Sequence, residues 1–243
     1  MTQSSLHKPS ALQLLLRRLR KLVAPPLSGG KLKSMAPKEI FSTIFHENAW
    51  KGTQSVSGKG SDRDQTHSLV TELPTLFSKY GVCSVLDVPC GDFNWMQQVD
   101  LSGVRYVGGD IVHDLIAQNE STYACPNIRF ACIDLLTDAL PEVDLIMCRD
   151  CLVHFSFAHI HQALRNIAAS PAKFLLTTSF VDRTTNDDIL TGRWRPLHLQ
   201  LAPFNLPEPL DRILEGCTQD EGKYSDKAMC LWSIADLRDS LQG

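Results

Sequence analysis

The 243-residue sequence has no long apolar run, and a membrane-spanning helix needs about 20 predominantly apolar residues in a row. It also lacks a short apolar core followed by a small-residue cleavage site, which would mark a secretory signal. We therefore expect neither secretion nor a transmembrane anchor. The expected compartment is the cytoplasm.

The eight cysteines lack the spacing of a metal site. Cys148 and Cys151 form a C-x-x-C pair, but no second pair and no His pair stands at the distance that zinc sites use. Most of the cysteines lie in apolar runs, where a free thiol behaves as a small hydrophobe. The pattern predicts a reducing compartment and no bound metal.

Acidic residues are absent from residues 1–37, which hold seven Lys or Arg. Residues 38–243 therefore carry 17 basic against 27 acidic side chains, and this acidic body argues against nucleic acid as a partner. The apolar and basic run at residues 11–23 is compatible with an amphipathic surface helix, an arm in peripheral contact with a membrane, or an organelle-targeting sequence. A solvated, partly disordered extension is an equal alternative.

Pro, Gly and Ser punctuate residues 24–30, which is typical of a linker. The length of the chain favours one main domain. We therefore expect a basic N-terminal extension and linker over residues 1–37, partly disordered, and a folded domain over residues 38–243. The sequence leaves the oligomeric state open.

Apolar runs of strand length alternate with helical patterns along the middle of the chain. The predicted strands are residues 84–88, 104–109, 128–133, 143–148 and 173–180, and the predicted helices are 112–121 and 156–169. This alternation predicts an α/β fold with a Rossmann-like doubly wound sheet, mostly parallel. Residues 212–216 and 228–234 are expected to add a C-terminal antiparallel hairpin.

A further helix is expected to begin near Ser61, a plausible N-cap before an apolar stripe that includes Leu69, Leu73 and Phe77. Pro74 lies within this stripe. Because proline removes a backbone donor, we expect it to kink or restart the helix.

Aspartates lie at or just after the ends of four of the predicted strands: Asp87, Asp110, Asp134 and Asp150. Gly91 precedes Asp110 by 19 residues, close to the roughly 20 expected between a cofactor turn and the acid that binds a ribose diol. Asp also favours strand ends for purely local reasons. The turn lacks the G-x-G-x-x-G spacing of a dinucleotide pocket, so the pattern indicates a nucleotide-type cofactor other than a dinucleotide.

Several segments resemble, in order, the cofactor motifs of class I S-adenosylmethionine-dependent methyltransferases. They are VLDVPCGDFNWM (85–96), YVGGDIV (106–112), FACIDLLTDALPEVDLIMCRDCLVH (130–154) and KFLLTTSF (173–180). More narrowly, WKGTQSVSGKGS (50–61), TGRWRPLHLQLAPFNLPEP (191–209) and DKAMCLWSI (226–234) resemble a little-characterised branch of that superfamily. That branch carries a W-G-x-x-E-S-x-S-G-x-G-S block and an N-L-x-x-P-F-x-F-P-x-P block, from which Gln54 and His198 depart.

The resemblance implies S-adenosyl-L-methionine as the cofactor, which has no pyrophosphate for a glycine-rich turn to cradle. The resemblance also implies that one turn lies beneath the methionine part of the cofactor. This turn comprises Asp87, Pro89, Cys90, Gly91, Asp92 and Phe93. Pro89 and Phe93 stand where the superfamily usually has glycine. Asp110, with Ile111, would hold the ribose, Asp134 and Leu135 would flank the adenine, and Arg149 would lie where the fourth strand opens toward the methyl group.

Two residues are candidates for a catalytic base, Asp150 and His154, which are four apart and could share a helical face. His154 could instead only cap or pack the turn. Trp95 and Trp194 could line a substrate pocket or belong to the core.

Arg193 and Arg195 flank Trp194 in a long loop, and two guanidinium forks suit an anionic or sugar-like acceptor. The alternative is that they pin the loop by pairing with nearby carboxylates. The expected activity is methyl transfer to a small-molecule or saccharide-like acceptor. The competing hypotheses are an NAD-dependent oxidoreductase and a non-catalytic, methyltransferase-like binding module.

Overall fold

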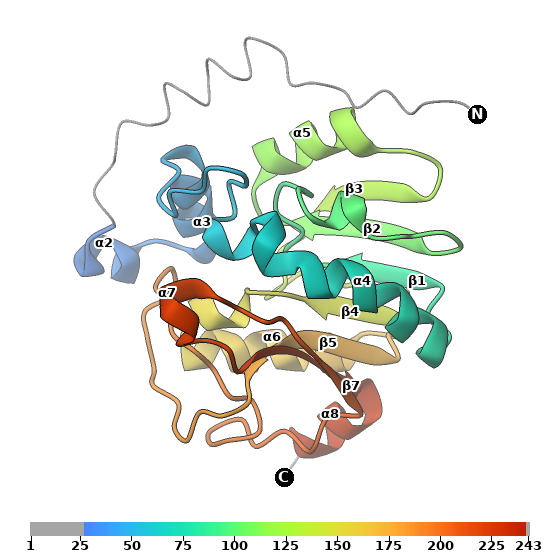
Figure 1. Ribbon diagram of the computed structural model, residues 1–243. Helices are drawn as coiled ribbons and strands as arrows, with labels where there is room; N and C mark the ends of the chain where they lie inside the picture. The colour runs from blue at the N-terminus through green and yellow to red at the C-terminus, as the bar shows by residue number, and fades with distance from the viewer. Residues whose placement is uncertain (1–26, 242–243) are drawn as a thin grey trace.

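The computed structural model describes residues 27–241 and centres on one seven-stranded sheet (Figure 1). The strands are β1 (Ser84–Asp87), β2 (Arg105–Asp110), β3 (Ile128–Cys132), β4 (Leu145–Cys148), β5 (Phe174–Phe180), β6 (Asp211–Leu214) and β7 (Lys227–Ser233). Their order is β3-β2-β1-β4-β5-β7-β6. The first five are parallel, and β7 pairs antiparallel with both β5 and β6. The predicted Rossmann-like fold and its C-terminal hairpin are confirmed.

The described residues also form several α-helices. They are α2 (Gly29–Ser34), α3 (Pro37–His46), α4 (Arg63–Tyr80), α5 (His113–Tyr123), α6 (Phe157–Ala169), α7 (Gln219–Gly222) and α8 (Ile234–Ser240). Short 3-10 helices η1 (Lys59–Ser61), η2 (Met96–Gln98) and η3 (Leu152–His154) lie in the loops. Helices α6 and α8 pack on one face of the sheet, and α4 packs on the other.

The central strands β1 and β4 are buried at every position because both of their faces are covered. In β1, Val85 belongs to the cluster under α4, whereas the next residue, Leu86, belongs to the cluster under α6. Leu145 and Ile146 of β4 divide between the two clusters in the same way. Successive strand side chains point to opposite faces, so a strand buried on both sides reads as a continuous apolar run.

Helix α4 corrects two expectations from the sequence. Its N-cap position is Asp62, one residue beyond the predicted Ser61, which lies in η1. The helix also continues through Pro74 to Tyr80 without a second start. Leu69, Leu73, Leu76 and Phe77 are buried along one face, and this packing outweighs the hydrogen bond that Pro74 cannot donate.

Helix α2 lies before the predicted domain boundary at residue 37, and its Leu32 packs with Ile40 and Ile44 of α3. The boundary itself stays a prediction. The apolar and basic run at residues 11–23 lies outside the described residues. Across residues 27–241, no helix has the length and apolar character to cross a membrane.

Candidate active site

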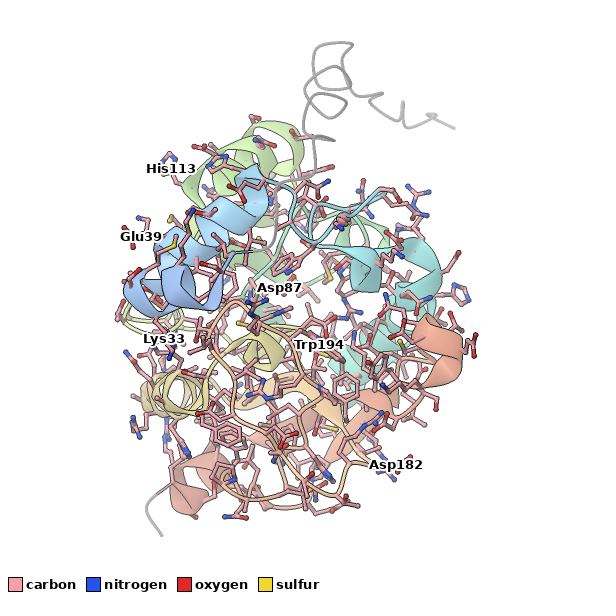
Figure 2. All side chains as sticks on the ribbon, turned by 90° about the vertical axis from the view of Figure 1, so that its left-hand side faces the viewer. Lys33, Glu39, Asp87, His113, Asp182 and Trp194 are labelled. Carbon is pink, nitrogen blue, oxygen red and sulfur yellow. The ribbon has the colours of Figure 1, made fainter. Side chains whose placement is uncertain are left out.

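A cavity of about 580 Å³ opens at the carboxyl ends of the parallel strands. Asp87 and Trp194, both in its lining, are labelled in Figure 2. Its lining brings together most of the residues that the sequence singled out, namely Asp87, Pro89, Cys90, Gly91, Asp92, Trp95, Asp110, Ile111, Asp134, Leu135, Arg149, Asp150, His154, Arg193 and Trp194. Two predicted site residues, Phe93 and Arg195, do not line it.

Asp87 ends β1 as a buried carboxylate. Tyr106 Oη donates a hydrogen bond of 2.6 Å to its Oδ2 atom. Burial raises the pKa of Asp87 to about 7, and the Tyr106 hydrogen bond offsets only part of that effect. The group therefore stands between its neutral and ionised forms near neutral pH.

Asp110 ends β2 beside Asp87, and it is buried in the same way. Its carboxylate accepts from the backbone N–H groups of Val112 (3.0 Å) and Gly91 (3.3 Å). Burial raises its pKa to about 6. A carboxylate can accept about four hydrogen bonds, so Asp110 retains lone pairs for hydroxyl groups that enter the cavity.

The turn after β1 holds a second loop close to itself. Gly91 has a φ of 56°, and a Cβ atom there would lie 2.3 Å from Ser57 Oγ. Asp92 accepts from Ser55 Oγ (2.8 Å) and from the backbone N–H of Val56 (2.9 Å). Both oxygens of this predicted cofactor residue therefore engage the protein itself.

Phe93 lies behind the turn rather than in the cavity. Its ring packs against Tyr106, Tyr123 and Phe130 at centroid distances of 5.2 to 5.3 Å. Phe93 also has a φ of 56°, the left-handed region that favours glycine. The structure thus places this residue as a core aromatic that supports the turn.

The loop after β3 forms an apolar edge of the cavity. Leu135 is buried, and Ile133 and Ile111 line the cavity beside it. Asp134 braces this loop, because its Oδ1 atom accepts from the N–H of Leu136 at 2.9 Å. The arrangement can hold a flat, apolar ring next to a polar edge.

Four charged side chains meet where β4 opens toward the cavity, and we call them the charge quartet: Arg149, Asp150, Glu215 and Lys227. Arg149 Nη2 lies 2.6 Å from Glu215 Oε2. Lys227 Nζ lies 2.6 Å from Asp150 Oδ2 and 3.2 Å from Glu215 Oε2. Two cations and two carboxylates therefore compensate each other in a buried position.

The charge quartet determines what Asp150 can do. Burial alone would raise the pKa of this carboxyl, but Lys227 and Arg149 together lower it to about 2. A carboxylate that is ionised and paired in this way is a weak base. Arg149 also stacks over the ring of Trp95 at 5.4 Å, so the tryptophan joins the cavity wall through this contact.

His154 is the better-placed proton acceptor. Its Nδ1 atom lies 2.9 Å from the carbonyl oxygen of Arg193. Because a carbonyl oxygen only accepts, Nδ1 carries the hydrogen and the lone pair resides on Nε2. Burial lowers the pKa of His154, which keeps the imidazole neutral at pH 7, and the ring of Trp50 stacks on it at 4.9 Å.

The two arginines of the long loop differ in their surroundings. Arg195 is buried and donates to the backbone carbonyls of Asp187 (3.1 Å), Leu152 (2.9 Å) and Phe155 (2.9 Å). Arg193 lines the cavity, and its Nη2 atom donates to Leu27 O at 3.1 Å. The structure therefore places only Arg193 where a ligand could meet it.

Trp194 forms part of an aromatic wall at the cavity mouth. Its ring stands edge-on to Tyr224 at 5.0 Å and to Phe180 at 6.0 Å. The side chain is 42% exposed, so the indole is available to a ligand.

Sequence reasoning missed Glu215, Lys227 and Tyr224. Glu215 lies 66 residues from its partner Arg149, and no local spacing connects them. Lys227 did leave a signal, because it is a single charge at the start of the apolar strand KAMCLWS. Within residues 27–241, no group of three His, Cys, Asp or Glu side chains could hold a metal ion.

A family model described as "Methyltransferase domain" matches residues 85–171. No curated protein matches the chain in sequence. The match covers the turn after β1, the ends of β2 and β3, and the opening of β4.

Solved methyltransferase structures share the fold. Human N-acetylserotonin methyltransferase, in complex with SAM, matches with a TM-score of 0.57 and 14% identity, over 89% of this chain and 64% of its own. Phosphoethanolamine N-methyltransferase 1 of Haemonchus contortus matches with a TM-score of 0.61 and 12% identity, over 86% of this chain and 54% of its own. The N-methyltransferase NodS of Bradyrhizobium japonicum WM9 matches with a TM-score of 0.52 and 16% identity, over 71% of this chain and 97% of its own. This chain thus spans less than two thirds of the length of the human enzyme.

Proposed function

We propose that this chain, a member of the class I S-adenosylmethionine-dependent methyltransferase superfamily, transfers the methyl group of S-adenosylmethionine to a small-molecule acceptor. The observation that carries the proposal is the pair of buried carboxylates, Asp87 and Asp110, which line one cavity at neighbouring strand ends. The hydrogen bonds that they accept come from neutral donors. Buried carboxylates without a bonded cation suit ligand hydroxyls or a ligand cation.

On this proposal, Asp110 accepts the two ribose hydroxyls, and Leu135 with Ile111 encloses the adenine beside Asp134. The turn that comprises Asp87, Pro89, Cys90 and Gly91 lies beneath the amino-acid end. The methyl group is carried on a sulfonium, which leaves as a neutral thioether.

The turn does not favour a dinucleotide. Pyrophosphate binding in a Rossmann-like fold uses a helix N-terminus directly after the glycine-rich turn. Here the turn is followed by η2, a 3-10 helix of three residues. An NAD-dependent oxidoreductase is therefore the weaker hypothesis. Against a non-catalytic module, the buried carboxylates Asp87 and Asp110 line the cavity without a bonded cation, which is costly unless a ligand meets them.

The acceptor that the cavity supports is a hydroxylated, saccharide-like molecule. Trp194 and Tyr224 offer aromatic surface to a ring, and Arg193 offers donors beside them. Asp150 stays ionised and can accept from a hydroxyl. His154 Nε2 takes the proton that the attacking hydroxyl loses, because its tautomer leaves that nitrogen free to accept.

Calorimetric titration with S-adenosylmethionine, S-adenosylhomocysteine and NAD tests the donor. We expect both sulfur compounds to bind and NAD not to bind. His154→Gln serves as the matched control, because it alters only the acceptor side and should leave donor affinity unchanged. Binding of NAD alone, or of none of the three ligands, would overturn the proposal.

A further inference from the structure

Residues 55–61, which we call the strap, lie across the turn after β1 and form one wall of the cavity. One end is held by Asp92, which accepts from Ser55 and Val56. The other end is held by Arg149, whose Nη2 atom donates to Gly60 O at 2.8 Å. The strap therefore has a fixed position between the cofactor turn and the charge quartet.

We infer that the strap completes the donor site and that Lys59 binds the carboxylate at the amino-acid end of the donor. The inference rests on the proposed function. The acidic side chains that line the cavity near the turn are Asp87, Asp92, Asp110 and Asp134. They suit the hydroxyls and the cationic groups of S-adenosylmethionine, but they repel its carboxylate, which needs a cation.

Four cations line the cavity within residues 27–241: Lys59, Arg149, Arg193 and Lys227. Arg149 and Lys227 are paired with the carboxylates of the charge quartet. Arg193 donates to Leu27 O and lies beside Trp194, in the acceptor half. Among the hydrogen bonds and ion pairs of the described residues, none involves the ammonium group of Lys59, so its charge is available to a ligand.

Asp92 acts on the donor through the strap and is a positioning residue. Its two oxygens hold Ser55 and Val56, which lie four and three residues before Lys59. The tight contact of Ser57 with Gly91 keeps the same segment against the turn. The change Asp92→Asn should therefore displace Lys59. It also removes one negative charge that repels the donor's carboxylate, so a weaker affinity would come from the displacement and not from the lost charge.

The test compares two ligands of the same site. S-adenosylhomocysteine carries the amino-acid carboxylate, whereas 5′-methylthioadenosine keeps the nucleoside and the sulfur but lacks the amino-acid end. Lys59→Met should weaken binding of S-adenosylhomocysteine about tenfold by calorimetry, since one charge-assisted contact is lost. Its affinity for 5′-methylthioadenosine should stay within about twofold. The matched control is Lys51→Met, which changes a nearby lysine that does not line the cavity and should alter neither affinity.

Asp92→Asn should displace the strap and thereby lower the ratio of the affinity for S-adenosylhomocysteine to the affinity for 5′-methylthioadenosine. A purely structural role would lower the melting temperature and leave the ratio unchanged. In a Lys59→Met background, Asp92→Asn should have no further effect on the ratio, because the two residues act on one contact.

An equal loss for both ligands in Lys59→Met, or no loss for either, would overturn the inference. An Arg193→Gln variant that loses only S-adenosylhomocysteine would assign the carboxylate to Arg193 instead. Failure of the unaltered protein to bind either ligand would count against the proposed function, so the two failures are distinguishable.

Discussion

The two halves of the cavity differ in what surrounds their buried carboxylates and in the direction of the carboxyl pKa shifts. In the turn half, Asp87 and Asp110 accept only from neutral donors, and burial raises the pKa of both. In the other half, where β4 opens toward the cavity, Asp150 and Glu215 contact Arg149 and Lys227, and these cations lower the pKa of Asp150 to about 2.

On the proposed function, this difference separates carboxylates that would contact a ligand from carboxylates that are already paired within the protein. A carboxylate buried without a cation costs folding free energy, and a ligand that supplies donors or positive charge recovers it. A carboxylate already paired with a buried cation recovers much less free energy from a ligand, although it can still accept a hydrogen bond from a hydroxyl. The low pKa of Asp150 and its pairing with Lys227 therefore make it a poorer candidate for the proposed base than His154.

The largest expected effect comes from breaking the charge quartet. Glu215→Ala leaves Arg149 and Lys227 buried without their shared partner, and we expect a loss of roughly 3–5 kcal/mol in the free energy of unfolding. Urea unfolding monitored by circular dichroism would measure it. Lys79→Met breaks the exposed ion pair with Asp211 and is the matched control, which should change stability little. Equal effects of the two variants would remove the distinction between the halves.

The dependence of stability on pH should show the two halves separately. Asp87 and Asp110 have pKa values of about 7 and about 6 in the folded state, against 3.8 unfolded. The folded state therefore binds more protons between about pH 4 and pH 7, and the stability that these two groups contribute falls as pH rises through that window.

The contribution of Asp150 to the pH dependence of stability has the opposite sign. Its pKa of about 2 in the folded state lies below 3.8, so its contribution is present above about pH 4 and is lost as pH falls toward 2. Urea unfolding at a series of pH values should show both slopes. The double variant Asp87→Asn and Asp110→Asn should flatten the slope between pH 4 and 7 only, and an unchanged slope there would contradict the assignment.

The remaining expected effect is on donor affinity rather than on the free energy of unfolding. Asp110→Ala should weaken binding of S-adenosylmethionine by about 1.5–3 kcal/mol for each charge-assisted hydrogen bond lost, which is about tenfold or more. The free energy of unfolding should not fall much, because the removed carboxylate was buried without a cation and itself cost folding free energy. Calorimetry measures the affinity, and thermal unfolding of the same sample controls for folding. Unaltered affinity would remove Asp110 from the donor site.

The sequence predicted the elements whose patterns are local. Apolar runs and turn residues located the parallel strands within one or two residues, and the aspartates after β1 and β2 were expected at one sheet edge. Helix α4 was misjudged at Pro74, because tertiary packing of Leu73 and Phe77 overrides a local propensity.

The contacts between distant segments could not be predicted in the same way. The pairing of Arg149 with Glu215 depends on β7 lying between β5 and β6, which no spacing reveals. Asp92 binds Ser55 and Val56 of the strap, which are 37 and 36 positions away from it in the sequence. Arg195 was assigned to the substrate from its residue type, but its partners are backbone carbonyls, which look the same in every sequence.

The tautomer of His154 is set by a main-chain atom, the carbonyl of Arg193. Any residue at position 193 presents that same oxygen, so side-chain changes there can be explored by mutagenesis or by evolution without disturbing the imidazole. The constraint falls instead on the neighbouring Gly192, where φ is 92° and a Cβ atom would lie 2.6 Å from Ile40 Cγ2. A library that tests the proposed acceptor role of position 193 should therefore keep glycine at 192.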